Sequence, residues 1–460
     1  MSDKRYLLAL LLAGCAAGPD FQRPQLPEVK TYGISGPAAL GEKIPAQWWR
    51  LFRSPRLDET LHQVIAANYS LVAAKASLAQ AQEAIREARA AFYPQLDLGA
   101  SARAATGAGG NLFSIGPAAT WSIDAFGGAR RRVEQEEALA ENQGYQLAAT
   151  YLALTGSTVT EAILIAYTRL QIATVQDLIQ NDEKNLDLVQ REFNAGKVAK
   201  SDVLTAAAQL ASDRTQLPAL HQQLSVARHA LSILSARAPG QWTPPDFDTT
   251  ELVLPEQVPL SLPSELVRQR PDILAAEAML HANSAAIGVA TSQLYPSITL
   301  TASLTRDAPS LGGLFGSAGS NVLSGGGAID APLFRGGGLD AQRDAAVDAY
   351  QAQLATYQQT VLQAFGQVAD ALSALEDDGE MVAVSRNATD IAGQSLALQR
   401  LSFSAGKTSA LQLIVAENTY SSSRLGYVRA LSQQMADTAQ LFIATGGGWW
   451  DSADLHAASH

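Results

Sequence analysis

The chain repeats one plan twice, and this duplication limits its possible folds more than any other feature of the sequence. The stretch AFYPQLDLGAS at 91–101 aligns with QLYPSITLTAS at 293–303, an offset of 202 residues. Further along, REFNAGK at 191–197 aligns with LSFSAGK at 401–407, an offset of 210 residues. We therefore expect two similarly folded halves of about 205 residues each.

Each half contains a long tract that is free of proline, the residue that interrupts helices most strongly. No proline occurs between Pro117 and Pro218, or after Pro332. In the first tract, apolar residues recur every seven positions in two registers, which begin at Val133 and Ala138. Two such seams predict a coiled-coil helix with neighbours on more than one side.

The long helices are expected at 128–193 and 338–403, and in both cases the end residues are 65 positions apart. At about 1.5 Å per residue, each helix would run roughly 100 Å, far more than a globular core requires. Shorter helices must line them. We expect these at about 69–92, 272–294, 198–237 and 408–444.

Three residues are expected to shape the helix ends. Gly196 and Gly406 follow the long helices, where a permissive backbone is needed. Pro218 lies within an expected helix and should kink it.

Stretches of alternating polarity precede both long helices. SITLTASLT at 297–305 alternates hydroxyl side chains with isoleucine, leucine and alanine. Alternation over about ten residues is typical of a transmembrane β-barrel with a wet interior, although a sandwich sheet at the surface would show it too. Four strands are expected, at about 94–105, 114–126, 296–307 and 321–334. Polar candidates for the barrel lumen are Asp97, Asp124, Thr299, Thr301 and Asp330.

Four strands cannot close a barrel, because closure takes about eight. The sequence therefore predicts a barrel that several chains build together.

The N-terminus predicts export and lipidation. Lys4 and Arg5 precede an apolar run that is too short to span a bilayer. Residues 1–14 are therefore expected to be a signal peptide. The segment LAGC, which ends at Cys15, the single cysteine, resembles a bacterial lipobox, and Cys15 would then be acylated; the alternative is a lone thiol after a poor leader.

The segment after Cys15 differs in character from the rest of the chain. Residues 15–56 are expected to form a lipid-anchored extended segment, and residues 446–460 a flexible C-terminal tail. Beyond the leader, no stretch is expected to reach the roughly 18 apolar residues of a spanning helix.

Composition and motifs argue against other classes of function. With a net charge of −11, the chain has no excess of positive charge that could neutralise many phosphates, so a nucleic-acid partner is not expected. The segment SAGKTS lacks the first glycine of a phosphate-binding loop, since residue 401 is leucine. The six histidines lack metal-ligand spacing. We expect no enzyme activity, no cofactor and no metal site.

Two long segments resemble a known family. QWWRLFRSPRLDETLHQVIAANYSL at 47–71 and LVRQRPDILAAEAMLHANSAAIGVATSQLYPSITLTAS at 266–303 look like the outer-membrane factor (TolC-like) family, in particular its NodT-type lipoprotein branch, which serves resistance-nodulation-division efflux pumps. The paired F-x-A-G-K motifs carry the same likeness.

The resemblance implies an α+β membrane protein that acts as a homotrimer. Its twelve-stranded β-barrel, with four strands per chain, would continue into a long coiled-coil α-helical barrel with a mixed equatorial region. The helical end would engage a periplasmic adaptor protein, and the adaptor would link it to the inner-membrane pump.

The resemblance also implies an aperture at the helical end that opens like an iris, often guarded by acidic residues near the second turn. Here that turn contains Lys407, Thr408 and Ser409, and the first acid is Glu417, so an acidic ring there is in doubt. Asp202 in the first turn is an alternative, with a helix cap as its favoured role. The aperture candidates are Gly196, Lys197, Asp202, Gly406, Lys407, Thr408 and Ser409.

The function expected is an outer-membrane exit duct that passively conducts drugs or metal ions from a tripartite efflux pump. Its two repeats are expected at 57–262 and 263–445. A type I protein-secretion duct is the alternative within transport, and a structural coiled-coil lipoprotein is the alternative outside it.

Overall fold

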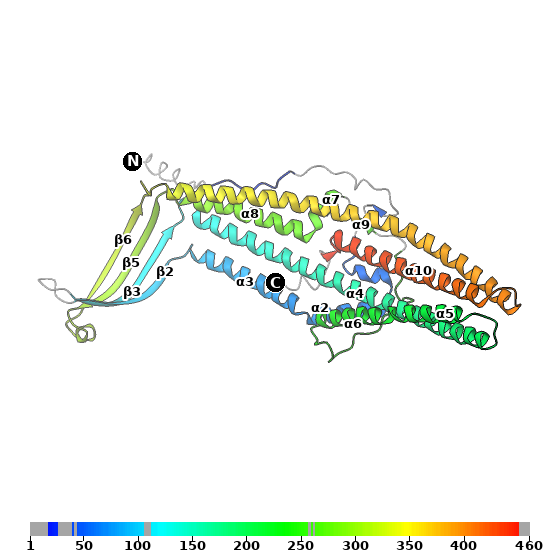
Figure 1. Cartoon of the computed structure of the whole chain (residues 1–460). Helices are drawn as coiled ribbons and strands as arrows, with labels where there is room; N and C mark the ends of the chain where they lie inside the picture. Colours follow the sequence, from blue (N-terminus) through cyan, green and yellow to red (C-terminus); the bar gives the residue numbers. More distant parts are fainter. Residues whose placement is uncertain are drawn as a thin grey trace. The chain divides into compact units, whose positions relative to one another are not determined.

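The computed structural model describes residues 17–25, 39–40, 44–104, 112–255, 259–260 and 263–449. Most of them are helical, and the remainder include one four-stranded antiparallel sheet (Figure 1). The expected signal peptide, Cys15 and most of the expected C-terminal tail lie outside the described residues.

Two long helices run through the chain, one in each repeat. They are α4 (Gly128–Asn194) and α9 (Gly338–Ser404), and each has 67 residues. Both begin at the expected residue and end one residue beyond the expected end. A 22-residue helix stands before each sheet hairpin, α3 (Tyr69–Ala90) and α8 (Pro271–Ser292).

The two repeats differ after the long helix. The second repeat continues as one helix, α10 (Ala410–Ala444), whereas the first is divided into α5 (Lys200–Arg214) and α6 (Gln216–Leu234). Pro218 lies in the first turn of α6, where its missing N–H is tolerated. The expected kink is thus an interruption at Thr215, three residues before the proline.

The sheet contains β2 (Gln95–Arg103), β3 (Leu112–Ile123), β5 (Ser297–Ala308) and β6 (Ser320–Asp330), in the order β2-β3-β5-β6. Each repeat supplies one hairpin, and β3 pairs with β5 to join them. Residues 124–126 and 331–334, which were expected in strands, lie beyond the strand ends.

Several shorter elements complete the chain. They are a parallel pair, β1 (Ala39–Leu40) and β4 (Pro259–Leu260), the helices α2 (Pro55–Ala67) and α7 (Pro263–Gln269), and the 3-10 helices η1 (Trp48–Phe52) and η2 (Gly312–Phe315).

The chain forms two compact units, and each takes corresponding parts of both repeats. The first unit contains residues 1–26, 75–146 and 272–360, and with them the sheet. The second contains residues 27–74, 147–271 and 361–460. The units therefore do not coincide with the expected repeats, because α4 and α9 each contribute to both units.

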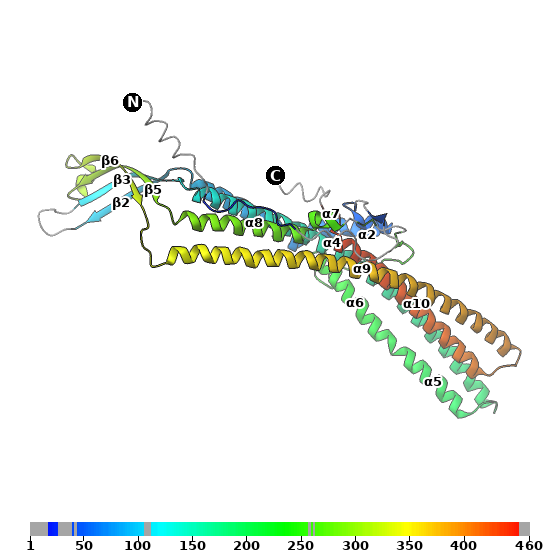
Figure 2. The same ribbon diagram turned by 90° about the horizontal axis from the view of Figure 1, so that it is seen from above.

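In the second unit, α5 lies beside the end of α4, and α10 lies beside the end of α9 (Figure 2). The carboxylate of Glu183 on α4 accepts a hydrogen bond from Arg214 of α5 at 2.6 Å. Each long helix and the helix after it therefore form a hairpin.

Two tryptophans near the start of the described chain, Trp48 and Trp49, pack into the core of the second unit. Trp48 and Trp49 are buried, and the Trp48 ring stacks on Phe442 at 5.2 Å. Phe52 meets the same Phe442 ring edge-on at 6.3 Å. The indole N–H of Trp449 donates to the carbonyl of Gln269 at 2.7 Å.

In the first unit, residues 17–25 form a segment that we call the N-terminal strap. The Ala17 amide donates to the Phe126 carbonyl at 3.0 Å. Phe21 stacks on His281 at 4.6 Å, and Arg23 pairs with Glu277 at 2.6 Å. The strap is thus bound to the start of α4 and to α8 through backbone, aromatic and ionic contacts.

Two of the described helices, α4 and α8, have an 18-residue window that is apolar enough to cross a membrane by length and composition alone. Such a window can contain up to two charged residues, so the expectation that no uncharged apolar stretch of this length follows the leader stays a prediction. In α4, 61% of that window is buried inside the protein. An apolar helix in a protein core is buried in the same way.

Candidate functional site: the sheet faces and the hairpin tips

The strand register collects the apolar residues on one face of the sheet. Leu96 pairs with Ala119, and Ala119 pairs with Ala302. Residues that pair directly lie on the same face. The apolar face comprises Leu96, Leu98, Ala119, Trp121, Ile123, Ile298, Leu300, Ala302, Leu304, Leu323 and Ile329.

The other face collects hydroxyl, amide and carboxylate side chains. Thr120 pairs with Gln95 on one side and with Thr301 on the other. Asp97 lies in the next polar row with Ala118 and Ser303, and the hydroxyls of Ser303 and Ser324 are 2.8 Å apart. The register therefore places four of the lumen candidates on one polar face: Asp97, Thr299, Thr301 and Asp330.

The apolar face is open in the single chain. Leu98 is 76% exposed and Leu323 is 80% exposed. A contiguous apolar surface of this kind is rare on a soluble monomer and is normally covered by lipid or protein. With a polar face opposite, the sheet has the two-sided character of a strand set between lipid and water.

Glycine at position 116 lets β3 and β5 come close together. A Cβ placed on Gly116 would lie 2.1 Å from the Leu304 carbonyl oxygen and 2.7 Å from the Thr305 Cα. Since both are backbone atoms, any larger residue would push the two repeats' hairpins apart.

Asp124 has a different place from the one the sequence predicted. It follows the last residue of β3, and its carboxylate accepts hydrogen bonds from the amides of Ala129 at 3.0 Å and Arg130 at 3.1 Å. The Arg130 guanidinium adds a contact at 3.1 Å. Asp124 therefore caps the N-terminus of α4, where a negative charge is favoured, and its assignment as a lumen residue is not supported.

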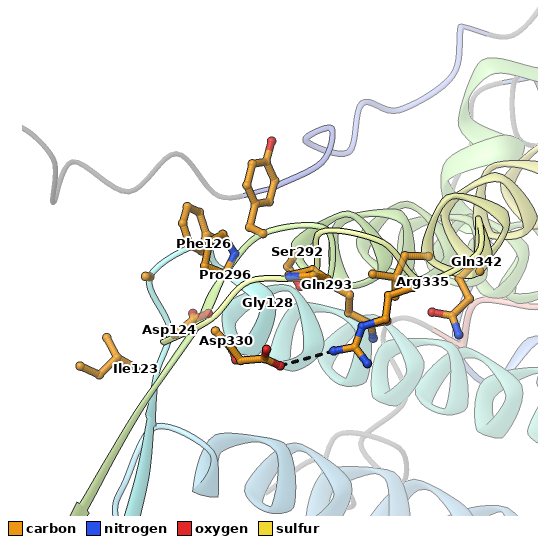
Figure 3. A pocket seen from close by; sticks show the side chains of 16 residues that line it. Ile123, Asp124, Phe126, Gly128, Ser292, Gln293, Pro296, Asp330, Arg335 and Gln342 are labelled. Carbon is orange, nitrogen blue, oxygen red and sulfur yellow. Dashed lines mark hydrogen bonds and ion pairs between the residues drawn. The ribbon is translucent and has the colours of Figure 1, made fainter. Parts of the chain in front are cut away.

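Asp330 ends β6 in the second repeat, and among the described residues its side chain bonds to Arg335, before α9, and not to the first turn of that helix. Its carboxylate lies 3.4 Å from the Arg335 guanidinium, and both side chains are exposed (Figure 3). The same Ile-Asp-Ala triplet thus has different bonding in the two repeats.

A cavity of about 540 Å³ lies where the strands give way to helices. Its wall includes Asp124, Ser292, Gln293, Asp330 and Arg335 (Figure 3). Beside it, the ring of Phe126 stacks on that of Tyr295 at 4.9 Å. The strand ends therefore combine aromatic rings with polar groups, as interfacial positions do in membrane proteins.

The two hairpin tips have the same backbone structure. Gly196 has φ +72° and Gly406 has φ +69°, a region that favours glycine. The amide of Lys197 donates to the Glu192 carbonyl at 2.9 Å, and that of Lys407 donates to the Ser402 carbonyl at 2.8 Å. Both long helices thus end in the same glycine cap, as expected.

The helices after the tips are capped differently. In the first repeat, Asp202 accepts a hydrogen bond from the Ala199 amide at 3.1 Å, so the favoured interpretation of Asp202 as a cap is confirmed. In the second, Ser409 accepts from the Gln412 amide at 3.3 Å, and Gln412 accepts from the Ser409 amide at 3.4 Å. This reciprocal pair is a capping box.

Lys197 and Lys407 are exposed at the tips. Thr408, in contrast, donates its hydroxyl to Gln412 and lies 3.2 Å from Gln399. Beneath the tips an apolar cluster holds both hairpins together: Val189, Val203, Ala206, Ala410 and Ile414. All seven aperture candidates are therefore located at or next to the two tips, but their role as an aperture stays a prediction.

The sequence did not identify the buried carboxylates of the hairpins. Glu417 on α10 is buried and contacts the Arg400 guanidinium at 3.0 Å. It also accepts a hydrogen bond from Asn185 on α4. Glu417 therefore links the second hairpin to the first repeat's long helix. Acids at heptad positions normally face solvent, and no local signal marks them as buried.

The family model described as outer membrane efflux protein matches the chain twice, over residues 60–236 and 262–447. These two matches cover most of the chain and agree with the internal duplication.

Curated relatives match along nearly their whole length. Nodulation protein T of Rhizobium leguminosarum bv. trifolii is 28% identical over 96% of this chain and 96% of its own. Cation efflux system protein CusC of Escherichia coli (strain CFT073) is 27% identical over 96% of this chain and 98% of its own. Pyoverdine export outer membrane protein OpmQ of Pseudomonas aeruginosa is 28% identical over 88% and 87%.

Solved structures share the fold. The outer-membrane channel OprN superposes with a TM-score of 0.89 at 26% identity, over 95% of this chain and 100% of its own. The open state of the Neisseria gonorrhoeae MtrE outer membrane channel gives a TM-score of 0.84 at 26% identity, over 95% and 99%.

The doubled family match, the relatives and the four-stranded sheet with its two long helices lead to one conclusion. The chain belongs to the outer membrane efflux protein family and is an efflux channel of the outer membrane.

Proposed function

We propose that three copies of the chain form one duct, with a twelve-stranded barrel in the membrane that continues into a helical barrel. The supporting observation is the sheet order, which leaves β2 and β6 each with a single neighbour. Exposed edges of this length normally pair or aggregate. If the β2 edge of one copy joins the β6 edge of the next, the ring closes without a free edge.

The two faces of the sheet then have separate roles. The apolar face turns to lipid, and the polar face lines a water-filled lumen with Asp97, Thr299, Thr301 and Asp330. Because neither face carries a built binding site, we propose that the barrel conducts by diffusion and leaves selection to its partners.

The helical part also offers a surface for neighbouring copies. Val384, Ile391 and Leu398 recur at seven-residue spacing on α9, and all three are exposed in the single chain. A heptad stripe of this kind normally packs against another helix. We assign it to contacts within the helical barrel.

The tips are proposed to form the aperture and to meet the periplasmic adaptor protein. They combine a rigid glycine cap with exposed Lys197 and Lys407. The inner-membrane partner is proposed to be a resistance-nodulation-division pump, which supplies the energy. The duct itself carries out no reaction.

The cargo is proposed to be small molecules, either drugs or metal ions. The names of relatives mention cations, pyoverdine and an antibiotic. The comparisons thus favour efflux over a type I secretion duct.

The N-terminal lipid is proposed to be attached at Cys15. Ala17, two residues further along, is hydrogen-bonded to Phe126 just beyond the end of β3. An acyl chain attached here would enter the membrane next to the sheet and hold the duct at the periplasmic surface of the outer membrane.

Thiol labelling in planar bilayers tests this function with neighbouring positions. Thr301 lies on the polar face and Ala302 on the apolar face. We expect Thr301→Cys channels to lose current when a bulky, charged thiol reagent is added, and Ala302→Cys channels to keep it. A preparation without unitary currents, or with equal block in both variants, would contradict the proposal.

A further inference from the structure

Each helical hairpin holds a pair of aspartates, and the two pairs lie at the same heptad position. In the first hairpin, Asp182 on α4 lies 14 residues before Gly196, and Asp213 on α5 lies 17 residues after it. In the second, Asp378 lies 28 residues before Gly406, and Asp437 lies 31 residues after it. The second pair is therefore two heptads further from its tip on both helices, so both pairs have the same phase in the coiled coil.

The first pair is almost inaccessible to water. Asp182 is 3% exposed and Asp213 is 5% exposed. One carboxylate oxygen of Asp182, Oδ2, is buried and accepts no hydrogen bond from the residues that the structure describes. Two ionised carboxylates cannot remain buried in contact, because their repulsion adds to the loss of hydration.

The groups that donate hydrogen bonds to Asp213 do not neutralise its negative charge. Asp213 accepts hydrogen bonds from Gln209 at 2.7 Å and from Gln216 at 2.8 Å. Both donors are uncharged amides. Glu417 on α10 adds another negative charge nearby, but Arg400 and Asn185 already bind it. Arg429 lines the cavity that Asp213 also lines.

The second pair is less buried than the first, since Asp378 and Asp437 are both partly exposed. One oxygen of Asp378, Oδ2, is nevertheless buried and accepts no hydrogen bond within the described part of the chain, and Asp437 accepts a hydrogen bond from the Gln433 amide at 2.8 Å. Asp377 contributes a further negative charge. Among the described side chains, no lysine, arginine or histidine forms an ion pair with either aspartate.

A proton fits each pair better than a metal ion. Among the residues that the structure describes, no group of three His, Cys, Asp or Glu side chains could hold a metal. A single proton would convert one acceptor into a donor and supply the missing hydrogen bond between the two carboxyl groups.

We propose that each aspartate pair holds a shared proton that ties the two helices of its hairpin together, so that any movement separating the pair releases a proton and is favoured by rising pH. The inference deepens the proposed duct function by assigning it a form of regulation, and it rests on that function.

The direction of the pH effect follows from the protonation equilibria. Burial, and then the hydrogen bond and charge of the partner aspartate, raise the pKa of both Asp182 and Asp378 to about 7. Separated and hydrated, an aspartate has a pKa of about 4. Between about pH 4 and pH 7, the paired state therefore holds one more proton than the separated state. A rise in pH across this range lowers the free-energy preference for the paired state, and above about pH 7 the proton no longer contributes to that preference.

The experiment is single-channel recording of the full-length protein in planar bilayers between pH 4.5 and 8.5. We expect the open fraction to rise with pH, by up to about tenfold per pH unit for each pair, and to level off above about pH 7. The double variant Asp182→Asn with Asp378→Asn imitates the protonated pairs, and it should remain in the low-pH behaviour throughout.

Glu183→Gln serves as the matched control, because Glu183 is adjacent to Asp182 but forms an exposed pair with Arg214. It should keep the parental pH profile. A double variant with the parental profile, or a parent without pH dependence, would overturn the inference while leaving the duct intact. Absence of any current would instead refute the duct.

A second measurement does not depend on channel activity. The infrared absorption of protonated carboxyl groups should be present in the parent at pH 6 and decline around pH 7, and each single variant, Asp182→Asn or Asp378→Asn, should lose part of it. A parent whose carboxyl groups are all ionised at pH 6 would contradict the shared proton.

Discussion

Gly18 of the N-terminal strap lies directly against Gly288 of α8, so closely that a Cβ added to Gly18 would come within 2.5 Å of the Gly288 Cα. Gly18 also has φ +85°, a conformation that favours glycine. A Cβ on Gly288 would in turn lie 2.7 Å from the Ala17 carbonyl oxygen. The strap is therefore fitted to α8 at the level of the backbone.

The first prediction concerns this contact. Gly288→Val should displace the strap, because a Cβ there would lie 2.7 Å from the Ala17 carbonyl oxygen and 2.7 Å from the Cγ of the buried Arg131. Limited proteolysis should then cut near residue 20 at least ten times faster than in the parent. Gly426→Val on α10 is the control, since nothing lies within 4 Å of a Cβ there. Equal cleavage of both variants would contradict the contact.

The second prediction concerns Arg131, which is buried and binds four groups, among them the Gly18 carbonyl at 3.4 Å. Its guanidinium contacts Asp20 at 2.6 Å, Glu134 at 2.7 Å and the Ala17 carbonyl at 3.1 Å. Arg131→Met should destabilise the folded protein by about 2 kcal/mol, because Glu134 is left without its cation. Arg132→Met removes an ion pair between an exposed guanidinium and the partly buried Glu136 and should cost less, about 1 kcal/mol or below, in thermal unfolding.

The third prediction separates the two Ile-Asp-Ala triplets. Asp124→Ala removes two hydrogen bonds to the first turn of α4 and should cost about 1 kcal/mol. Asp330→Ala removes only an exposed ion pair and should cost clearly less. Thermal unfolding of both variants in the same detergent makes the comparison. Equal losses would mean that the Asp124 cap does not stabilise α4.

The fourth prediction concerns the tips. Gly196→Ala and Gly406→Ala each place a side chain at a positive φ and should destabilise the hairpins by about 1 kcal/mol. Gly366→Ala is the control within α9, because it is helical and a Cβ there meets nothing; it should be neutral or stabilising. Hydrogen exchange at the hairpin ends would show the loss as faster exchange in the tip variants alone.

The sequence predicts the regular part of this fold because that part depends on periodic patterns. Heptad spacing and the absence of proline placed α4 and α9 within one residue of their ends. Alternation placed the strands and sorted Thr299 and Thr301 onto the polar face, since side chains alternate along any strand.

Features that depend on tertiary contacts were not predicted. Asp124 has the pattern of a strand residue, and only the turn that precedes α4 makes it a cap. Asp182 and Asp213 look like solvent-facing acids until the hairpin closes over them. The strap has no periodicity, so its docking through Gly18 and Gly288 leaves no pattern to read. The compact units likewise arise from pairing of the repeats and not from either repeat alone.

The most direct test of the shared barrel is disulfide cross-linking between β2 and β6. Within one chain these strands are separated by β3 and β5, so a bond between them must join two copies. Cysteines would be scanned at 98–101 on β2 against 324–327 on β6, with Ser101→Cys and Ser114→Cys as the pair within one chain. The account predicts covalent products that end at three chains. Only monomers, or a ladder without an upper limit, would contradict it.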